Sequence, residues 1–520
     1  MTRRQRKALQ PLGVNYDVPP NLLPDQVYDA SFNVIFRDGK PQRCETFQSM
    51  YQELQVFPAP PLFALFAPQG GEGRWLVGTA SGAFGTDGSS HTDITPVGRL
   101  SVVESNQWTG TLLNGLAVAT NGENPPFYWD GNLQNPAVNL PDFPAQSCWS
   151  IRAYKNYLVA MNINGSEGRD EQLVLWSDAA PAGLIPDSWT PGPDSDAGNN
   201  VLADTVGPIL DAMPLRDDLV IYKPRSVYLM SFIGGEAVMS FRKLFGNRGA
   251  LAKNCVAEFE GKHYVLGDGD CYVHDGQNIV SVAEGRIQEF FFKNIDDSEA
   301  DNCFVVIDKP NSEVHFCAPA LDTVRVGFSL VYSIAQDAWT LRELPLVDHG
   351  ANGVITAGVV QNPLTYDAAT FPYTDQQADR QYNEGSLSTG GVLDGVLFAS
   401  EVNNALYWLG GDRTDVPLTQ QCALSWSDRS CGSPAMVKRT ERVWLHVEAP
   451  AGEVFTVRLG GAFEPQAAPL FVTGEVVAGE SNFAALAVQG RYLTVNVRYD
   501  GAQPFTLRGW ELEYIETGEY

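Results

Sequence analysis

A short phrase that returns three times along the chain restricts the possible folds more than any other feature. Each copy has an aromatic residue, two further residues and then Asp-Gly, and the copies span 84–88, 127–131 and 272–276. An apolar run typical of a β-strand precedes each copy. Because Asp-Gly tolerates positive φ angles, each copy predicts a tight hairpin turn. A fourth Asp-Gly pair lies near the N-terminus, and the predicted turn residues are Asp38, Gly39, Asp87, Gly88, Asp130, Gly131, Asp275 and Gly276.

The spacing of these turns indicates a repeated unit. Gly131 lies 43 residues after Gly88, and Gly276 lies 145 residues after Gly131, which is about three further steps. A hairpin-bearing unit that recurs every 40 to 50 residues or so is typical of a β-propeller, in which each repeat is one four-stranded blade. Six or seven blades account for about 300 to 350 residues. The chain has 520 residues, so a separate module must supply the remainder.

Seven apolar runs, each followed by a turn, indicate about seven blades. We expect each run to be the inner strand of its blade. The runs begin at Arg74, Asn114, Asn156, Asp218, Lys262, Glu313 and Val396. A propeller needs its two ends held together. A strand from residues 31–50 is the natural candidate to complete the last blade, because it would hide two sheet edges.

The sequence pattern changes after Pro434. Four or more segments there, such as 492–499, alternate apolar and polar residues. Strict alternation predicts strands with one buried face, and several of them over about 85 residues suit a small β-sandwich. Long helices are not expected. The sequence therefore predicts an all-β protein with an extended N-terminal arm over 1–30, a β-propeller over 31–415 that the N-terminal strand closes, and a C-terminal β-sandwich-like domain over 416–520.

The charge of the chain limits its partners. The formal net charge is −27, which argues against tight binding to nucleic-acid phosphates, because such binding needs clustered Lys and Arg. It does not argue against DNA passing near the protein, since an acidic wall repels DNA and lets a duplex slide without adhering. A more general interpretation is that the acidic surface keeps the protein soluble.

The cysteines and the N-terminus indicate where the protein is made. The eight cysteines form no CxxC pair and no zinc-ribbon spacing. The N-terminus is basic but leads into Pro and Asn rather than into the apolar segment of a signal peptide. No run of 18 apolar residues occurs, so no membrane anchor is expected. We expect a protein made in the cytoplasm, with reduced and mostly buried thiols.

Sequence motifs of known enzyme chemistry are missing. The chain has no P-loop, no GxSxG elbow and no HExxH motif. Cys271 and His274 have a ligand-like spacing, but residues three apart on a strand point to opposite faces, which favours ordinary packing. Asp194 and Asp196 lie in an acidic loop that lacks the downstream Glu of a calcium loop. We therefore predict no catalytic residue, no cofactor and no metal ligand.

Two long insertions interrupt the blades, at 185–205 and 362–391. Loops of this length in a compact fold are usually functional or disordered. They are the candidate lumen, gate or partner loops. Their candidate residues are Asp187, Trp189, Asp194, Asp196, Asp367, Tyr373 and Asp375.

Both ends of the chain resemble one family of proteins. The stretches 13–25 and 33–43 resemble the opening of tail proteins from short-tailed (podovirus-like) bacteriophages. The stretches 490–499 and 504–514 look like the C-terminal strand pair of the same proteins. With blades between them, the resemblance covers most of the chain. The family is the tail nozzle protein, also called tail tubular or stabilisation protein.

The resemblance implies a structural role in the virion. Members form a hexameric ring below the portal and its adaptor, with each β-propeller on the outside of a central tube that conducts DNA. The C-terminal domain would then contribute to the tube or ring. The ring also helps to retain the genome until ejection and offers a docking surface to tail fibres or spikes. Six copies would carry 6 × −27 = −162 formal charges, so phosphate would be repelled on its way out.

Two other classes of function stay open at this point. A propeller-type glycan hydrolase needs only two carboxylates on either side of a sugar bond, although the chain has no repeated Ser-x-Asp-x-Gly-x-x-Trp box of the sialidase type. A carbohydrate-binding tail protein, acting as a monomer, is the other alternative. Ring assembly separates both from the nozzle.

Overall fold

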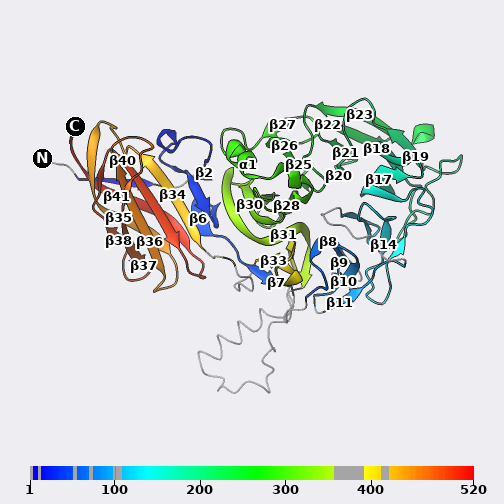
Figure 1. The fold of residues 1–520 in the computed structure, drawn as a ribbon, viewed down its shortest axis with the longest axis horizontal. Helices are drawn as coiled ribbons and strands as arrows, with labels where there is room; N and C mark the ends of the chain where they lie inside the picture. The colour runs from blue at the N-terminus through cyan, green and yellow to red at the C-terminus, as the bar shows by residue number, and fades with distance from the viewer. Residues whose placement is uncertain are drawn as a thin grey trace, which may run out of the picture.

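The structure is a computed structural model that describes residues 4–9, 13–50, 56–68, 74–88, 90–97, 100, 108–356, 392–410, 418 and 421–519. Nearly all of its elements are β-strands, in two units that lie side by side, a sandwich and a larger propeller (Figure 1). The helices in these ranges are short: α1 (Gln288–Asn294), η1 (Pro20–Leu22), η2 (Gly235–Ala237), η3 (Asp297–Asn302) and η4 (Val402–Asn404). No helix in the described part is long and apolar enough to cross a membrane. The predicted all-β class is confirmed.

The larger unit is a propeller of seven antiparallel blades. The first five blades are separate four-stranded sheets. They consist of β8 (Pro61–Ala67), β9 (Arg74–Thr79), β10 (Ala83–Thr86) and β11 (His91–Asp93); β12 (Thr109–Leu113), β13 (Leu116–Thr120), β14 (Phe127–Trp129) and β15 (Val138–Asn139); β16 (Ser147–Tyr154), β17 (Tyr157–Gly165), β18 (Gly168–Trp176) and β19 (Gly198–Val201); β20 (Asp211–Leu215), β21 (Asp218–Lys223), β22 (Ser226–Phe232) and β23 (Met239–Gly246); and β24 (Val256–Phe259), β25 (Lys262–Gly267), β26 (Asp270–His274) and β27 (Ile279–Ser281).

Blades 6 and 7 share one seven-stranded sheet. The reason is β31 (Ala338–Thr356), whose first half is the outer strand of blade 6 and whose second half is the inner strand of blade 7. Its register shifts between Val347 and His349, where one half ends and the other begins. The other strands of the two blades are β28 (Phe304–Asp308), β29 (Glu313–Cys317), β30 (Val326–Ser333), β32 (Val392–Ser400), β33 (Ala405–Leu409) and β7 (Phe47–Ser49).

The N-terminal segment closes the ring. The innermost strands β8, β12, β16, β20, β24 and β28 and the second half of β31 contact one another in turn, and β31 contacts β8. β7 pairs with β33, with Phe47 opposite Leu409, and so becomes the outermost strand of blade 7. The pairing covers the edge of β33, which would otherwise be open to other chains.

The seven apolar runs in the sequence are the second strands of the blades, not the innermost ones. They are β9, β13, β17, β21, β25, β29 and β32. A second strand is covered on both faces: in β21, Val220 and Tyr222 pack into one hydrophobic cluster and Leu219 and Ile221 into another. Such a strand reads as a continuous apolar run, whereas an innermost strand also carries polar residues that face the axis.

The recurring Asp-Gly phrase marks the same place in three blades. It opens the connection from the third to the fourth strand in blades 1, 2 and 5. The 43-residue step is therefore one blade, and the 145-residue step is three. Gly88, Gly131 and Gly276 have positive φ angles of 86°, 79° and 88°. The predicted blade period is confirmed.

Of the four Asp-Gly pairs singled out in the sequence, only the first makes the predicted two-residue turn. Asp38 and Gly39, with φ angles of 50° and 68°, join the paired residues Arg37 and Lys40. The other three pairs open loops of four or more residues, because the Asp side chain accepts backbone N–H groups further on. Asp275 Oδ1, for example, accepts from Gln277 N (2.9 Å) and from the amide of the next residue.

The smaller unit is a sandwich of two sheets. One sheet has the order β38-β35-β41-β6-β5, with β1 on β41 and β39 on β35, and the other has the order β37-β36-β40-β34-β4. Trp426 and Trp510, from different sheets, meet edge to face with ring centroids 4.9 Å apart. The strands are β1 (Arg4–Leu9), β4 (Ala30–Phe32), β5 (Val34–Arg37), β6 (Lys40–Arg43), β34 (Cys422–Arg429), β35 (Met436–Glu448), β36 (Val454–Ala462), β37 (Leu470–Val477), β38 (Phe483–Ala485), β39 (Gln489–Gly490), β40 (Tyr492–Tyr499) and β41 (Thr506–Glu519).

The structure corrects the predicted boundaries at the N-terminus. β1 pairs with β41 along its whole length, and the parallel pair β2 (Gly13–Val14) and β3 (Val27–Tyr28) follows it. β4 pairs with β34, and β6 pairs with β41. Residues 30–43 therefore belong to the sandwich, and from the predicted closing segment 31–50 only β7 belongs to the propeller. Pairing partners more than 380 residues away leave no local sequence signal.

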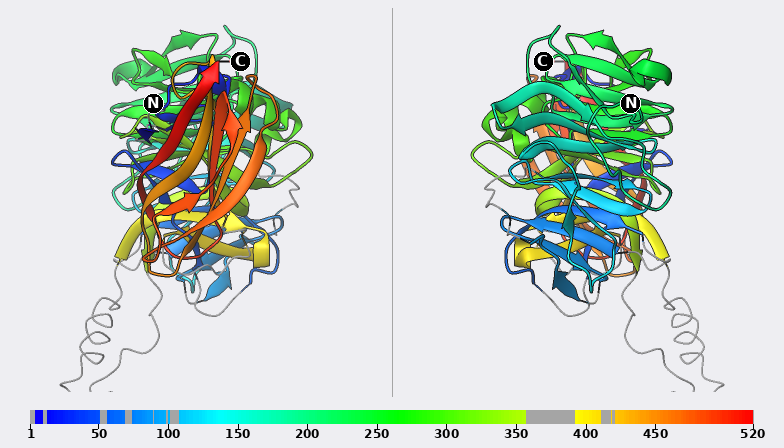
Figure 2. Two further views of the ribbon diagram at one scale, coloured as in Figure 1. Left: turned by 90° about the vertical axis from the view of Figure 1, so that its left-hand side faces the viewer. Right: turned by 90° about the vertical axis from the view of Figure 1, so that its right-hand side faces the viewer.

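The sandwich packs against the outer strand of blade 6. β2, β4 and β5 all contact β31. Ser31 Oγ lies 2.7 Å from Thr340 Oγ1, and Asn33 N donates to Leu341 O (2.9 Å). In the two side views, the sandwich and the propeller lie one behind the other, with both ends of the described chain in the sandwich (Figure 2).

Candidate functional site

A cavity lies on the axis of the propeller. Its volume is about 320 Å³, and each of the seven innermost strands contributes to its lining. Its walls include the apolar side chains of Phe63, Met213 and Val305. The exposed residues Glu258 and Lys309 lie where innermost strands lead into the turns toward the second strands. The cavity therefore has its mouth on the face of those turns.

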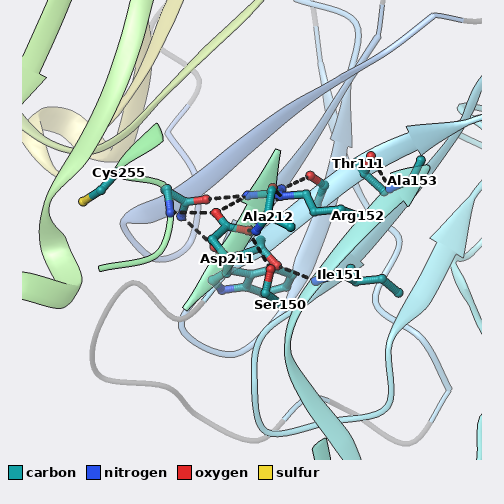
Figure 3. A network of polar contacts seen from close by, with 12 residues as sticks. Thr111, Ser150, Ile151, Arg152, Ala153, Asp211, Ala212 and Cys255 are labelled. Carbon is teal, nitrogen blue, oxygen red and sulfur yellow. Dashed lines mark hydrogen bonds and ion pairs between the residues drawn. The ribbon is translucent and has the colours of Figure 1, made fainter. Parts of the chain in front are cut away.

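A buried ion pair crosses the blades beside this cavity. Arg152, from β16, has 8% of its surface exposed. Its Nη2 donates to Asp211 Oδ2 (2.6 Å) and its Nε to Asp211 Oδ1 (2.9 Å), so the two side chains make a bidentate pair. The guanidinium also donates to Gly110 O in blade 2 and to Asn254 Oδ1 before blade 5 (Figure 3). One side chain thus links four blades.

Asp211 is as fully bonded as its partner. Its carboxylate also accepts from Ser150 Oγ (2.7 Å) and from Asn254 N (3.0 Å). Burial alone would raise the pKa of Asp211, but the charge of Arg152 and these hydrogen bonds outweigh it and lower the pKa below its usual value. Asn254 Nδ2 donates in turn to Trp108 O (3.0 Å), so the side-chain amide of Asn254 has hydrogen-bond partners for both its oxygen and its nitrogen.

Lys253 lies next to this network, and among the described residues its buried amine contacts an aromatic ring instead of a hydrogen-bond acceptor. Its amine lies 3.7 Å from the centroid of the Trp149 ring and has no hydrogen-bond partner in the described part of the chain. Burial lowers the pKa of Lys253 to about 7, against the opposing charges of Asp301 and Asp211. A cation–π contact is therefore its main polar interaction.

His349, on the second half of β31, lines the axial cavity as a neutral imidazole. Burial, with a smaller effect of Arg152, lowers the pKa of His349 to about 3. Its Nδ1 accepts from Ala64 N (3.4 Å), so the ring proton is on Nε2. No hydrogen bond to that Nε2 is found within the described residues. His349 therefore has one free N–H donor.

A second buried network, between blades 4 and 5, is neutral. The hydroxyl of Tyr222 lies 2.6 Å from both His263 Nδ1 and His274 Nε2. His263 Nε2 donates to Pro214 O (2.9 Å), and His274 Nδ1 accepts from Gly276 N (3.2 Å). These contacts fix one tautomer for each ring, so His274 donates to Tyr222 and Tyr222 donates to His263. Burial lowers the pKa of His263 to about 3 and of His274 to about 4.

The described residues offer no assembled metal site. Cys271 packs into a hydrophobic cluster, while His274 bonds to Tyr222. Within the described ranges, no group of three His, Cys, Asp or Glu side chains is placed to hold a metal ion. All eight cysteines are buried, and none of them is in a disulfide.

A third cluster lies at the junction of propeller and sandwich. Arg37 Nε, from β5, donates to Glu313 Oε1 (3.1 Å) in blade 6, and Arg37 also pairs with Glu45. Arg342 Nη1 lies 3.7 Å from Glu45 Oε2, beyond hydrogen-bond reach. Burial raises the pKa of Glu313 to about 7, because Arg37 only partly offsets it and Glu45 and Asp308 reinforce it.

The predicted loop residues have different environments. Trp189 is 4% exposed and packs edge to face on Phe143, with ring centroids 5.1 Å apart, so it belongs to the core rather than to a partner surface. Asp196 accepts from the hydroxyl of Tyr157 (2.8 Å). Asp187 and Asp194 are exposed. The predictions for Asp367, Tyr373 and Asp375 lie outside the described residues.

Sequence reasoning missed every residue of the axial cavity. Among them are Arg152, Lys309 and His349, and the buried partner of Arg152, Asp211, was missed as well. The sequence did contain a usable signal. The innermost strand of a blade comes directly before the second strand in the chain, and a tight turn joins the two. For β17, going back over this turn crosses Lys155 and Asn156 and reaches β16, a mostly buried strand that carries Arg152 as its one charged residue.

Comparisons with known proteins leave the family open. No protein-family model and no curated protein match the chain. Similar solved structures include the Pan2 WD40 domain of Neurospora crassa, at 9% identity and a TM-score of 0.36, covering 71% of this chain and 97% of that one. PorZ, a surface component of the type-IX secretion system of Porphyromonas gingivalis, has 10% identity and a TM-score of 0.36, covering 81% and 54%. A glycoside hydrolase has 10% identity and a TM-score of 0.25, covering 89% and 100%. At such scores these likenesses carry no argument about function.

Proposed function

We propose that this chain is a structural protein of a bacteriophage tail. Six copies form a nozzle below the portal and its adaptor in the virion, after assembly in the host cytoplasm. The nozzle conducts genomic DNA, helps to retain it, and offers a docking surface to tail fibres or spikes. The chain acts without catalysis or a cofactor.

One observation carries the proposal: the two ends that resemble tail nozzle proteins fold together. β4, which lies between the two N-terminal stretches, pairs with β34, and β34 pairs with β40 from the C-terminal stretch 490–499. β6 reaches β41, where Gln42 lies opposite Thr506. The resemblance therefore falls on one continuous body rather than on two unrelated termini.

This topology makes the propeller an insertion into the sandwich. The chain leaves the sandwich after β6 and re-enters it at β34, and all seven blades lie between. Such a layout suits a subunit in which the sandwich builds a shared tube and the propeller is an outer platform. The net charge of −27 suits the same role, because an acidic assembly repels the phosphates of a passing duplex.

Imaging of the protein with purified, DNA-filled heads that lack tails tests the proposal. We expect a six-fold stub at the portal vertex and DNA retained in the heads. A protein that stays monomeric, ignores the heads and instead cleaves or binds glycans would overturn the proposal.

A further inference from the structure

The sandwich has one edge strand that is long, open and apolar. β37 ends its sheet, and among the described strands it pairs with β36 alone. Leu470, Phe471 and Val472 are 83%, 36% and 40% exposed, so apolar side chains lie on both faces of the strand. Phe463, in the turn that leads from β36 to β37, is 53% exposed. Unpaired backbone groups beside exposed apolar side chains form a template for a further strand.

The outer edges of the propeller are protected in ways that β37 is not. The outermost strands β7, β11, β15, β19 and β27 have only two to four residues each. β23 is as long as β37, but it exposes Arg242 and Lys243, and its pairing contains a register shift. Short strands, charges and bulges are the usual protections against strand addition. The open edge of β37, in a chain that protects its propeller in this way, indicates a surface that another strand covers.

A second open edge lies on the opposite side of the sandwich. β41 pairs with β35 and with β1 at the same residues, for example Ile515 with both Arg439 and Arg4, so β1 lies on the side of β41 away from β35. No described strand pairs with the other side of β1. β37 contacts β38, which lies beyond β35 at the far end of the sheet that carries β1. The sandwich therefore separates the two open edges.

The charges of the two edges are complementary. The sequence of β1 has no acidic residue and contains Arg4, Arg6 and Lys7. The segment 463–482 holds β37 and the turns on both sides of it. Its charged residues are all acidic and all exposed: Glu464, Glu475 and Glu480. Because the sandwich separates the two edges within one copy, a basic β1 can meet an acidic β37 only between two copies.

We propose that β37 of one copy pairs with β1 of a second copy of this chain. The sheet that carries β1 then continues into the sheet that ends in β37 of the neighbour, and the contact covers Leu470 and Val472. A contact between two different edges is heterologous, so it repeats from copy to copy and can close into a ring. The inference deepens the proposed function: the number of copies in the ring rests on that function, whereas the surface rests on the two edges.

Sedimentation velocity of the full chain tests the surface. The wild type should associate at concentrations below about 100 µM. Leu470→Lys places a cation opposite the basic strand and should raise the concentration needed for association at least about tenfold, whereas Leu470→Glu should raise it much less. Val280→Lys is the matched control, because Val280 is 57% exposed on β27, an outermost strand of the propeller, and this change should have no effect.

Two chains, each with one edge blocked, test the head-to-tail order. A chain without residues 1–9 lacks β1 but keeps β37, and Leu470→Lys keeps β1 but has a blocked β37. Each alone should stay monomeric, and their mixture should form a 1:1 dimer and nothing larger. A cooperative urea transition for each chain shows that it is folded.

Three results would each overturn the proposal: a wild type that stays monomeric at about 100 µM, equal effects of Leu470→Lys and Leu470→Glu, or no dimer in the mixture of folded chains. Failure of the proposed function looks different. A wild type that associates through these edges but ignores DNA-filled heads would overturn the nozzle and support this surface. A six-fold stub that Leu470→Lys still builds on the heads would overturn the surface and support the nozzle.

Discussion

Two buried arginine clusters hold this molecule together, one inside the propeller and one between the propeller and the sandwich. Arg152 and Asp211 are both fully hydrogen-bonded, and the pKa of Asp211 lies below its usual value. Around Arg342 the bonding is incomplete: its Nε and Nη1 have no hydrogen-bond partner in the described part of the chain, and neither has Glu313 Oε2.

The difference between the clusters follows from their positions. The inner cluster is hydrogen-bonded to four blades, so its geometry is fixed once the ring closes. The junction cluster brings together Arg37 of the sandwich, Glu45 of the linking segment and Glu313 of blade 6. A cluster assembled from three separate parts has more freedom to adjust. We therefore expect the inner cluster to determine stability and the junction to respond to pH.

The largest effect is expected from breaking the inner cluster. Asp211→Ala leaves the Arg152 guanidinium buried without its counter-ion, which should cost about 3–5 kcal/mol of unfolding free energy. Urea denaturation measures this cost. Asp217→Ala, in the same blade but at an exposed position, is the control and should have almost no effect. A cost for Asp211→Ala as small as that of the control would contradict the comparison.

The pH response of the junction is the next effect in size. The pKa of Glu313 in the folded protein, about 7, lies above its usual value, so the folded state binds a proton that the unfolded state does not. Its contribution to stability is therefore present at low pH and lost as the pH rises through 7. Between pH 5 and pH 8 the wild type should lose about 2–3 kcal/mol that Glu313→Gln does not lose.

Paired denaturation curves of wild type and Glu313→Gln at both pH values measure this loss. Glu284→Gln, at an exposed position, is the control and should follow the wild type. Parallel behaviour of wild type and Glu313→Gln would show that Glu313 does not titrate in the folded protein.

The neutral network of blades 4 and 5 should respond to acid with the opposite sign. The pKa of His274, lowered to about 4, makes the folded state resist a proton that the unfolded state binds below about 6.5. The stability it supports is present above pH 6.5 and is lost as the pH falls toward 4. His274→Gln keeps a donor toward Tyr222 and should spare about 2 kcal/mol of that loss at pH 5. Thermal unfolding at pH 7 and pH 5 measures it, and an equal acid loss in both proteins would refute it.

The smallest effect is expected at Arg342. Arg342→Met removes a guanidinium with two unbonded nitrogens and keeps an apolar side chain against Phe47, so it should cost only about 1–2 kcal/mol. Urea denaturation beside Asp211→Ala gives the comparison directly. A cost equal to that of Asp211→Ala would mean that the two clusters are alike.

The sequence made the propeller visible through its second strands and its turns. Val220 and Leu219 face different cores, so β21 had to be apolar throughout, and β17 and β32 are divided between two cores in the same way. Asp38 and Gly39 form the turn that their dihedral preferences predict. Local preferences of this kind can be read without knowing the fold.

The boundaries and the cavity could not be read in this way. β4 lies next to β34 although about 390 residues separate them, and Arg152 finds its acceptors 42, 59 and 102 positions along the chain. Those contacts exist only after the ring has closed. The same limit explains why Lys309 and His349 did not stand out in the sequence.

The position of the two units in an assembled tail tests the central claim most directly. The sample is DNA-filled heads to which the missing tail proteins, including this chain, have been added. An electron cryo-microscopy map of their portal vertex would show where this chain lies. We expect a six-fold ring with the sandwich toward the bore and the propeller on the outside. A map in which the propeller lines the bore, or in which this chain forms no ring at the vertex, would contradict the account.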